Sequence, residues 1–361
     1  MSGRAHNFGA GPAALPLEVL EEARGELVDF RGAGMSLLEM SHRSKAYDAV
    51  HREALAGLAR VLGVPAGWSV LLLQGGASLQ FSMVPMNLMH PRRSADYLVT
   101  GEWAKKATRE AEREGRVRVA ATTEAEGFRR IPEPGELDLD PEADYVHLTT
   151  NNTLYGTQWR QPPDTGAVPL AADMSSDVLS RPVPWQRYGL VYAGAQKNLG
   201  PAGVTLVVVR DDLLVRALET LPIILRYRTH AASRSLYHTP PCWSIYVLGL
   251  ACAWVARQGG VAAMAAAAEA RSGRLYALLD GGGFYRGTAE PASRSRMNVT
   301  FRLPSEELEK RFLAAAAEEG LVNLKGHRAV GGIRASLYNA MPMAGVDALC
   351  AFMADFERRR G

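Results

Sequence analysis

Residues 188–205 read YGLVYAGAQKNLGPAGVT, in which an apolar run is followed by a glycine-rich loop that leads into a second apolar run. The runs Leu190–Ala193 and Thr205–Val209 are continuously apolar, which is typical of strands covered on both faces. Helical patterns such as Trp103–Glu114 separate earlier runs of the same kind. Those earlier runs are Val70–Leu73, Tyr97–Thr100, Val117–Ala120, Tyr145–Thr149 and Leu170–Ala172. The alternation predicts an α/β fold with a mainly parallel seven-stranded sheet.

The character of the sequence changes after Pro240-Pro241, where helical patterns replace the alternation. A long helical run, Ser244–Leu279, follows, and Gly259-Gly260 is the expected place of a break in it. The remaining predicted elements are an edge-like strand at Met297–Arg302, a charged amphipathic helix at Ser305–Glu319 and a final helix near Val346–Arg359. We therefore expect a large domain over residues 1–255 and a smaller α+β domain over residues 256–361. The first stretch of about 15 residues is expected to pack on the smaller domain.

Composition and charge exclude several classes of protein. The 361 residues are 47% hydrophobic and 22% charged, which excludes disorder, collagen and coiled coil. A formal net charge of +3 gives no indication of nucleic acid or of an acidic membrane as partner. The longest apolar stretch, Ile245–Ala256, is too short to cross a bilayer, and the first residues lack a signal-peptide pattern. Three cysteines without metal-ligand spacing fit a reducing compartment, so we expect a soluble cytoplasmic protein without a metal site.

Polar and glycine-rich segments follow the predicted strands at the edge where α/β sheets bind ligands. Gln74-Gly75-Gly76-Ala77-Ser78 opens a helix whose N–H groups suit an anion, although a plain tight turn explains it equally well. Trp103 begins the next helix, where half-buried packing is the alternative role. Thr150–Thr153 supplies polar groups. Asp173 ends a buried strand, where a carboxylate needs a cationic partner. The alternative role for Asp173 is that of a helix N-cap.

Lys197 is the best placed for covalent chemistry of the six lysines in the chain. The other five lie in charged or polar segments, at Lys45, Lys105, Lys106, Lys310 and Lys325. Partial desolvation beside an apolar strand would lower the pKa of Lys197 and make its amine nucleophilic toward an aldehyde. The alternative is a surface lysine in a tight loop. Together with an anion-binding helix start, an aromatic ring and a carboxylate, this lysine matches the needs of pyridoxal 5′-phosphate (PLP).

Five separated motifs resemble the phosphoserine aminotransferases, which are class-V, fold-type-I PLP enzymes, and the resemblance runs from end to end of the chain. The motifs are NFGAGPA at 7–13, EMSHRSK at 39–45, ADMSS at 172–176, AGAQKNLGPAG at 193–203 and GGIRASLYNA at 331–340. The resemblance implies reversible transamination of O-phospho-L-serine and 2-oxoglutarate to 3-phosphooxypyruvate and L-glutamate, in L-serine biosynthesis. Bacterial members often also act on a phosphorylated hydroxythreonine in pyridoxine biosynthesis.

The resemblance also implies how the cofactor is held. Lys197 would bind one PLP per subunit covalently and move a proton at the substrate Cα, and Asp173 would pair with the ring nitrogen. Further cofactor contacts would come from Ala77, Ser78, Trp103, Thr153 and Gln196. Family members are homodimers in which the neighbouring subunit completes the phosphate site, and the matching positions here are His238 and Thr239. His238 stands where the family has Asn, which suggests a pH-sensitive cofactor affinity.

Substrate contacts follow from the same resemblance. Arg334 would bind the α-carboxylate, and the distal anion would lie among His327, Arg328 and, from the partner subunit, His42 and Arg43. The planar fork of arginine pairs with a carboxylate or a phosphate, which one pocket must accept in turn. Solvated helix and loop positions are the alternative role for both His-Arg pairs. Some bacterial members have Arg where this chain has Ser78, so we expect altered affinity for the distal anion.

Three other functions compete with this interpretation. A cysteine desulfurase needs an exposed nucleophilic cysteine, whereas Cys350 falls on an apolar helical face and Cys242 and Cys252 lie in an apolar stretch. A transaminase for uncharged substrates would not require two His-Arg pairs. A non-catalytic PLP-binding dimer would not need Asp173 as well as Lys197.

Overall fold

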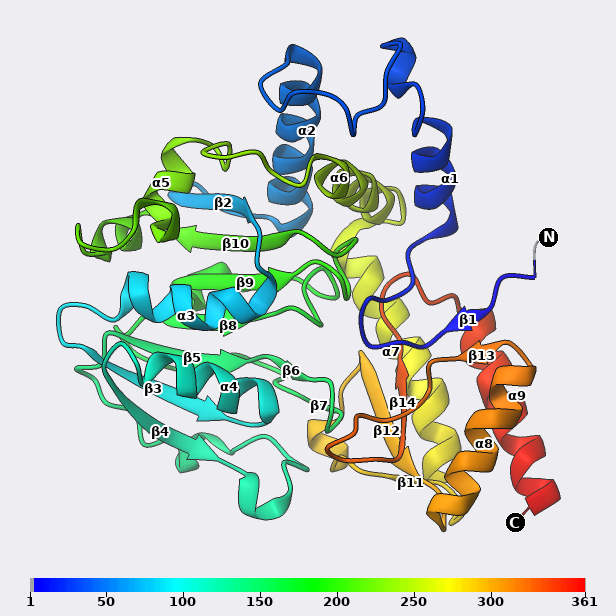
Figure 1. Cartoon of the computed structure of the whole chain (residues 1–361). Helices are drawn as coiled ribbons and strands as arrows, with labels where there is room; N and C mark the ends of the chain where they lie inside the picture. The colour runs from blue at the N-terminus through cyan, green and yellow to red at the C-terminus, as the bar shows by residue number, and fades with distance from the viewer. Residues whose placement is uncertain (1–2, 361) are drawn as a thin grey trace.

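The computed structural model describes residues 3–360 and contains a central seven-stranded sheet with the order β2-β10-β9-β8-β5-β3-β4 (Figure 1). The strands are β2 (Trp68–Leu73), β3 (Ser94–Val99), β4 (Arg116–Thr122), β5 (Tyr145–Thr149), β8 (Leu170–Asp173), β9 (Leu190–Gly194) and β10 (Thr205–Arg210). Only β10 runs antiparallel to its neighbours in this sheet. All seven predicted runs are strands of this sheet, so the prediction of a mainly parallel α/β fold is confirmed.

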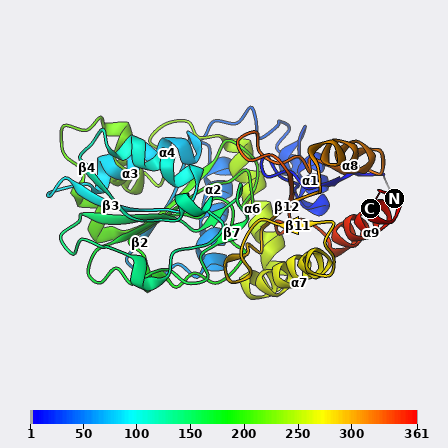
Figure 2. The same cartoon turned by 90° about the horizontal axis from the view of Figure 1, so that it is seen from below.

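Helices cover both faces of the sheet, which explains why its strands are apolar without interruption. Figure 2 shows α3 (Gly76–Leu88) and α4 (Glu102–Ala111) on one face. There Phe81 packs with Tyr97 and Tyr192 from the sheet. On the other face α2 (Lys45–Leu62) and α6 (Cys242–Arg257) contribute apolar side chains to a second cluster. The other helices outside the C-terminal part are α1 (Leu17–Gly25) and α5 (Tyr227–Ala232).

The predicted break in the long helical run is present. Gly259 and Gly260 have φ of 96° and 74°, the left-handed region that glycine adopts most readily, and they separate α6 from α7 (Gly260–Asp280). The two helices are bent by 80°. Among residues 3–360, no single helix is long and apolar enough to span a membrane, while α6 and α7 as a bent pair pass that test by length and composition alone.

A small sheet in the C-terminal part has the order β11-β12-β14, with strands at Arg286–Gly287, Asn298–Arg302 and Ile333–Ser336. The prediction that Met297–Arg302 forms an edge strand is therefore wrong, because β12 pairs on both sides. Both of its faces are also buried: Val299 and Phe301 face the helices, while Asn298 and Thr300 hydrogen-bond to the large sheet's loops. Helices α8 (Glu306–Glu318) and α9 (Met343–Arg360) flank this sheet.

The N-terminal segment crosses to the C-terminal part of the chain. Strand β1 (His6–Asn7) pairs in parallel with β13 (Leu321–Val322), and Phe8 is fully buried beside Val299 and Phe312. The residues after Phe8 then pass directly over Lys197, because a Cβ at Gly11 would lie 3.2 Å from the Lys197 Cγ. Short helical turns complete the chain at Phe30–Gly32, Glu124–Glu126, Pro134–Glu136, Trp185–Arg187, Asp211–Arg216, Ile223–Leu225 and Pro291–Ser293.

Candidate active site

The parallel strands bring the predicted site residues to one edge of the sheet. Helix α3 starts after β2, and Trp103 lies at the start of α4 after β3. Asp173 is the last residue of β8, and Lys197 follows β9. Figure 1 shows these carboxyl ends facing the C-terminal part of the chain, where β12 and β14 lie. The site is therefore built between the two parts of the molecule.

Asp173 is a buried carboxylate at the centre of this edge. It is 5% exposed and lies on the middle strand of the sheet, paired with Thr149 and Tyr192 on the neighbouring strands. The Ser175 N–H donates to its Oδ1 at 2.8 Å. Burial raises the pKa of Asp173, whereas the charge of Lys197 and the hydrogen bond from Ser175 oppose the rise. Such a carboxylate favours a cationic group above it.

Lys197 is partly buried beside Trp103, with its Nζ 5.4 Å from the centroid of the indole ring. Burial lowers the pKa of Lys197, and the charge of Arg334 lowers it further, while Asp173 acts in the opposite direction. The amine is therefore neutral over a wider pH range than an exposed lysine, and a neutral amine is the nucleophilic form.

Thr153 connects Trp103 with Arg334. The Trp103 Nε1 donates to the Thr153 Oγ1 at 3.2 Å, and the Arg334 Nη1 donates to the Thr153 carbonyl oxygen at 3.4 Å. Arg334 comes from β14 of the small sheet, so this contact joins the two parts of the chain at the site. Burial lowers the pKa of Arg334. Its guanidinium remains charged because the pKa of arginine begins so high.

The N-terminus of α3 provides an anion site beside Lys197. Among residues 3–360 no side chain caps this helix, so its first N–H groups are available to a ligand. Ala77 is half-buried and Ser78 is exposed there. The loop after β9 approaches closely because position 194 is glycine, and a Cβ there would lie 3.5 Å from the Ala77 nitrogen. Gln196, on the same loop, is exposed and accepts a main-chain hydrogen bond from Ala13 at 2.9 Å.

His327 and Arg328 approach the same side of the site as Arg334. Burial lowers the pKa of His327, and the charges of Arg334, Arg328 and Lys106 lower it further. Lys106 was not predicted as a site residue, yet its Nζ lies 4.6 Å from the centroid of the Trp103 ring. The signal in the sequence was its spacing, because residues three apart on a helix share a face.

The other predicted pairs are placed differently. His42 and Arg43 precede α2, whose neighbouring loops lie at the top of Figure 1, away from the carboxyl edge of the sheet. Within residues 3–360, neither has a hydrogen bond or ion pair to another predicted site residue, and the His42 Nε2 is buried without a partner. The His238 Nε2 lies 3.1 Å from the Gln74 Oε1, next to the glycine pair before α3, and Thr239 is exposed.

Comparison with known proteins places this arrangement in a family. The class-V aminotransferase model matches residues 5–349. A phosphoserine aminotransferase from Herpetosiphon aurantiacus is 54% identical over 357 residues, covering 99% of each chain. The chain belongs to the phosphoserine aminotransferases of the class-V family. A solved phosphoserine aminotransferase from Bacillus circulans subsp. alkalophilus superposes with a TM-score of 0.98 at 52% identity over 100% of both chains.

A further solved phosphoserine aminotransferase, 48% identical with a TM-score of 0.96 over 99% of both chains, carries a Schiff base. Class-V aminotransferases hold PLP on a lysine in this way, and the residues of the present site fit that cofactor. Lys197 offers a partly desolvated amine, Asp173 a buried carboxylate, Trp103 an aromatic face and α3 an uncapped N-terminus. Bound PLP supplies an electron sink for the negative charge that develops at a substrate Cα.

The lowered pKa of Lys197 predicts how this aminotransferase takes up its cofactor. The rate of covalent attachment of PLP to the apoprotein should rise with pH, with a midpoint below 10.5, the ordinary pKa of a lysine. Stopped-flow measurement of the visible absorbance band at a series of pH values would give this midpoint.

Asp173→Asn supplies the matched comparison for that prediction. The carboxylate of Asp173 raises the pKa of Lys197, so removing its charge should move the midpoint to still lower pH. A wild-type midpoint at or above 10.5, or an upward shift in the variant, would contradict the electrostatics described here.

Proposed function

We propose that this chain catalyses the PLP-dependent exchange of an amino group between O-phospho-L-serine with 2-oxoglutarate and 3-phosphooxypyruvate with L-glutamate, in L-serine biosynthesis. One observation carries the proposal: Arg334, from the other part of the chain, hydrogen-bonds to the Thr153 carbonyl oxygen, and its charge acts on the partly buried amine of Lys197. His327 and Arg328 add further basic groups at that position. The substrates of this reaction are anionic at both ends, so the reaction needs a binding site with several basic groups near the lysine.

The cofactor would be held by residues from several strands. Lys197 would bind it covalently, and the N–H groups of Ala77 and Ser78 would receive its phosphate together with Gln196. Trp103 would stack on the ring, and Thr153, which already holds the Trp103 indole, would contact the cofactor. The buried carboxylate of Asp173 would pair with the ring nitrogen and favour its protonated form.

Lys197 has a second task after substrate binds. Its amine would take up the proton that leaves the substrate Cα and hold it as a general base. Burial lowers the pKa of Lys197, so its amine releases a proton more readily than an exposed lysine does, which suits general acid–base catalysis. The loop of Gly11 lies over the lysine side chain and limits its conformations.

Substrate binding would divide between two anionic groups. Arg334 would pair with the α-carboxylate, which all four reactants share. His327 and Arg328 would bind the distal phosphate or γ-carboxylate, together with His42 and Arg43 of a second subunit. Within residues 3–360, His42 and Arg43 have no hydrogen bond or ion pair to another predicted site residue of their own chain, which is why we assign them to the site of a neighbouring copy.

We propose a homodimer in which each subunit completes the other's site, with His238 and Thr239 reaching the phosphate of the cofactor across the interface. Apolar side chains near these segments are exposed in the single chain. This supports a second copy of the chain that buries them in an interface. Val28 and Leu38, 81% and 62% exposed, lie in the segment before His42. Ile223 and Tyr237, 53% and 46% exposed, lie in the segment before His238.

Several broader proposals accompany this one. We propose a large domain over residues 1–255 and a small domain over residues 256–361, supported by the separate apolar cluster of the C-terminal part, which includes Phe8. We also propose a cytoplasmic location, because three free cysteines fit a reducing compartment. Activity on a phosphorylated hydroxythreonine in pyridoxine biosynthesis is proposed by family resemblance only.

A cysteine desulfurase function is disfavoured by the state of the thiols. Cys252 and Cys350 are buried. Burial raises the pKa of Cys252 to about 12 and also raises those of Cys350 and Cys242. Such thiols are poor nucleophiles at neutral pH because the thiolate is the reactive form.

Arg334→Ala tests the substrate assignment. The variant should raise KM for O-phospho-L-serine and for 2-oxoglutarate alike, because it removes a shared charge-assisted contact worth about 1.5–3 kcal/mol, roughly tenfold or more in affinity. Steady-state kinetics with each substrate varied in turn would measure this, with Lys197→Ala as the inactive comparison. An effect on only one substrate would show that Arg334 is not the common carboxylate site.

Mixed dimers test the shared active site. Chains carrying Lys197→Ala and chains carrying a strongly impaired Arg43→Ala would be co-expressed with different tags. If sites are shared, a mixed dimer contains one intact site, so an equal statistical mixture should recover about a quarter of wild-type activity. Each homodimer is the control. A mixture no more active than its separate parents would contradict the proposal that Arg43 acts across the interface.

A further inference from the structure

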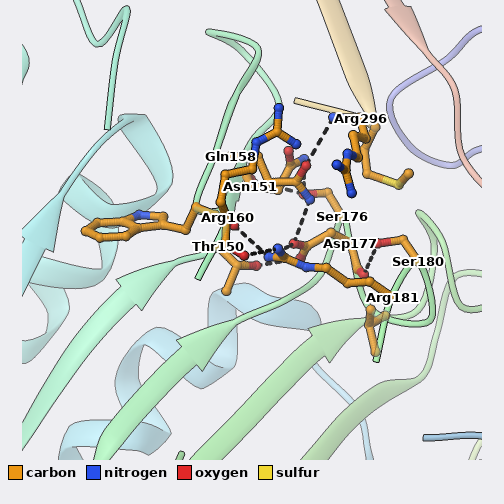
Figure 3. Close-up of polar contacts among 12 residues, drawn as sticks. Thr150, Asn151, Gln158, Arg160, Ser176, Asp177, Ser180, Arg181 and Arg296 are labelled. Atoms are coloured by element: carbon orange, nitrogen blue, oxygen red, sulfur yellow. Dashed lines mark hydrogen bonds and ion pairs between the residues drawn. The ribbon is translucent and has the colours of Figure 1, made fainter. Parts of the chain in front are cut away.

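The hairpin formed by β6 (Asn151–Asn152) and β7 (Thr157–Gln158) connects the large sheet with the small one. The Asn151 Nδ2 donates to the Asn298 Oδ1 at 2.8 Å, and the Ser295 hydroxyl donates to the Asn151 Oδ1. The Arg296 N–H donates to the Gln158 Oε1 at 3.0 Å, a contact that Figure 3 shows bridging the two segments. We refer to Asn151 and Asn298 together as the asparagine bridge.

One end of the asparagine bridge is tied to the segment of Asp173. The Asn151 Nδ2 also donates to the Ser176 Oγ at 2.8 Å, and that hydroxyl donates back to the Asn151 carbonyl oxygen at 3.1 Å. The neighbouring Thr150 donates from its N–H and its hydroxyl to the Asp173 carbonyl oxygen, both at 3.0 Å. Figure 3 shows Thr150, Asn151 and Ser176 gathered in this network.

The other end of the asparagine bridge is tied to the strand of Arg334. The Asn298 Nδ2 donates to the Ser336 Oγ at 2.9 Å and to the Tyr338 hydroxyl at 3.3 Å. Ser336 follows Arg334 by two residues on β14, so both side chains face the same side of the small sheet. The register of β12 and β14 pairs Asn298 with Ser336. The placement of β14 against the large sheet therefore depends on the hydrogen bonds of these two side-chain amides.

The asparagine bridge is buried, and its hydrogen bonding is complete. Asn151 is 1% exposed and Asn298 is fully buried, and every nitrogen and oxygen of both side-chain amides has a hydrogen-bond partner. In such a network the loss of one member leaves several buried polar groups without partners, so the remaining groups rearrange.

We propose that Asn151 and Asn298 are positioning residues, which fix β14 and its Arg334 guanidinium against the large sheet and thereby set the affinity for the substrate α-carboxylate. They contact neither the cofactor residues Lys197 and Trp103 nor the Arg334 side chain by hydrogen bonds, and they act through Ser176, Ser336 and the two sheets. This inference rests on the proposed function, because the position of Arg334 matters only if Arg334 binds substrate.

Asn298→Ala in the holoenzyme is the test. KM for O-phospho-L-serine and for 2-oxoglutarate should both rise roughly tenfold, because small misplacements of a binding group have large kinetic effects. The change in kcat should be smaller, and the PLP content and visible spectrum should match those of the wild type. Ser336→Ala removes one acceptor with little change in volume, so it should shift KM in the same direction even if Asn298→Ala does not fold.

Asn87→Ala is the matched control. Asn87 is 2% exposed and makes three hydrogen bonds, to Met83, Leu225 and Tyr227, all remote from the small sheet. This variant should lower the melting temperature without raising either KM. Unchanged KM values in both Asn298→Ala and Ser336→Ala would overturn the positioning role. An equal rise of KM in Asn87→Ala would overturn it as well.

Arg334→Ala in the same series separates the two possible failures. If Arg334→Ala raises both KM values while the bridge variants do not, the bridge proposal fails and the carboxylate assignment stands. If Arg334→Ala leaves both KM values unchanged, the assignment of Arg334 fails, and the bridge proposal fails with it.

Discussion

The structure depends on one electrostatic constraint: an amine and a carboxylate are both withdrawn from water at the carboxyl edge of a parallel sheet. Burial lowers the pKa of Lys197 and raises that of Asp173, and the charge of each opposes the shift of the other. Such a pair is costly unless further groups complete it. A cofactor with a phosphate, an aldehyde and a basic ring nitrogen is complementary to this arrangement, with α3 receiving the phosphate.

The chemistry also requires substrate charge to be recognised at a fixed distance from the amine. The large sheet alone cannot do this, because Arg334, His327 and Arg328 all come from the C-terminal part of the chain. The charges of Arg334 and Arg328 act on His327, and the charge of Arg334 also acts on Lys197. The formal net charge of the whole chain is only +3, so this positive potential is local to the site. The contacts between the two parts of the chain are therefore part of the binding site.

The sequence predicted the features that depend on local pattern. Continuous apolar runs located all seven strands of the large sheet, and the setting of Lys197 distinguished it from five other lysines. Strand β12 was predicted at the right residues but wrongly as an edge strand, because a short strand such as Asn298–Arg302 does not reveal how many partners it pairs with. The contact between Asn151 and Asn298 spans 147 residues, and no local pattern predicts a hydrogen bond over that separation. Lys106 was missed because it resembled any charged residue on a helix.

The most direct test of the account is a half-reaction of the purified holoenzyme with O-phospho-L-serine in the absence of any keto acid. L-serine, L-alanine and L-cysteine are added in parallel, and the visible band of the lysine-bound cofactor is followed. The account predicts that O-phospho-L-serine depletes the band at much lower concentration than the unphosphorylated amino acids, because only it engages the basic groups around His327 and Arg328. Equal responses to all four amino acids would contradict the central claim that this site selects a substrate with a distal anion.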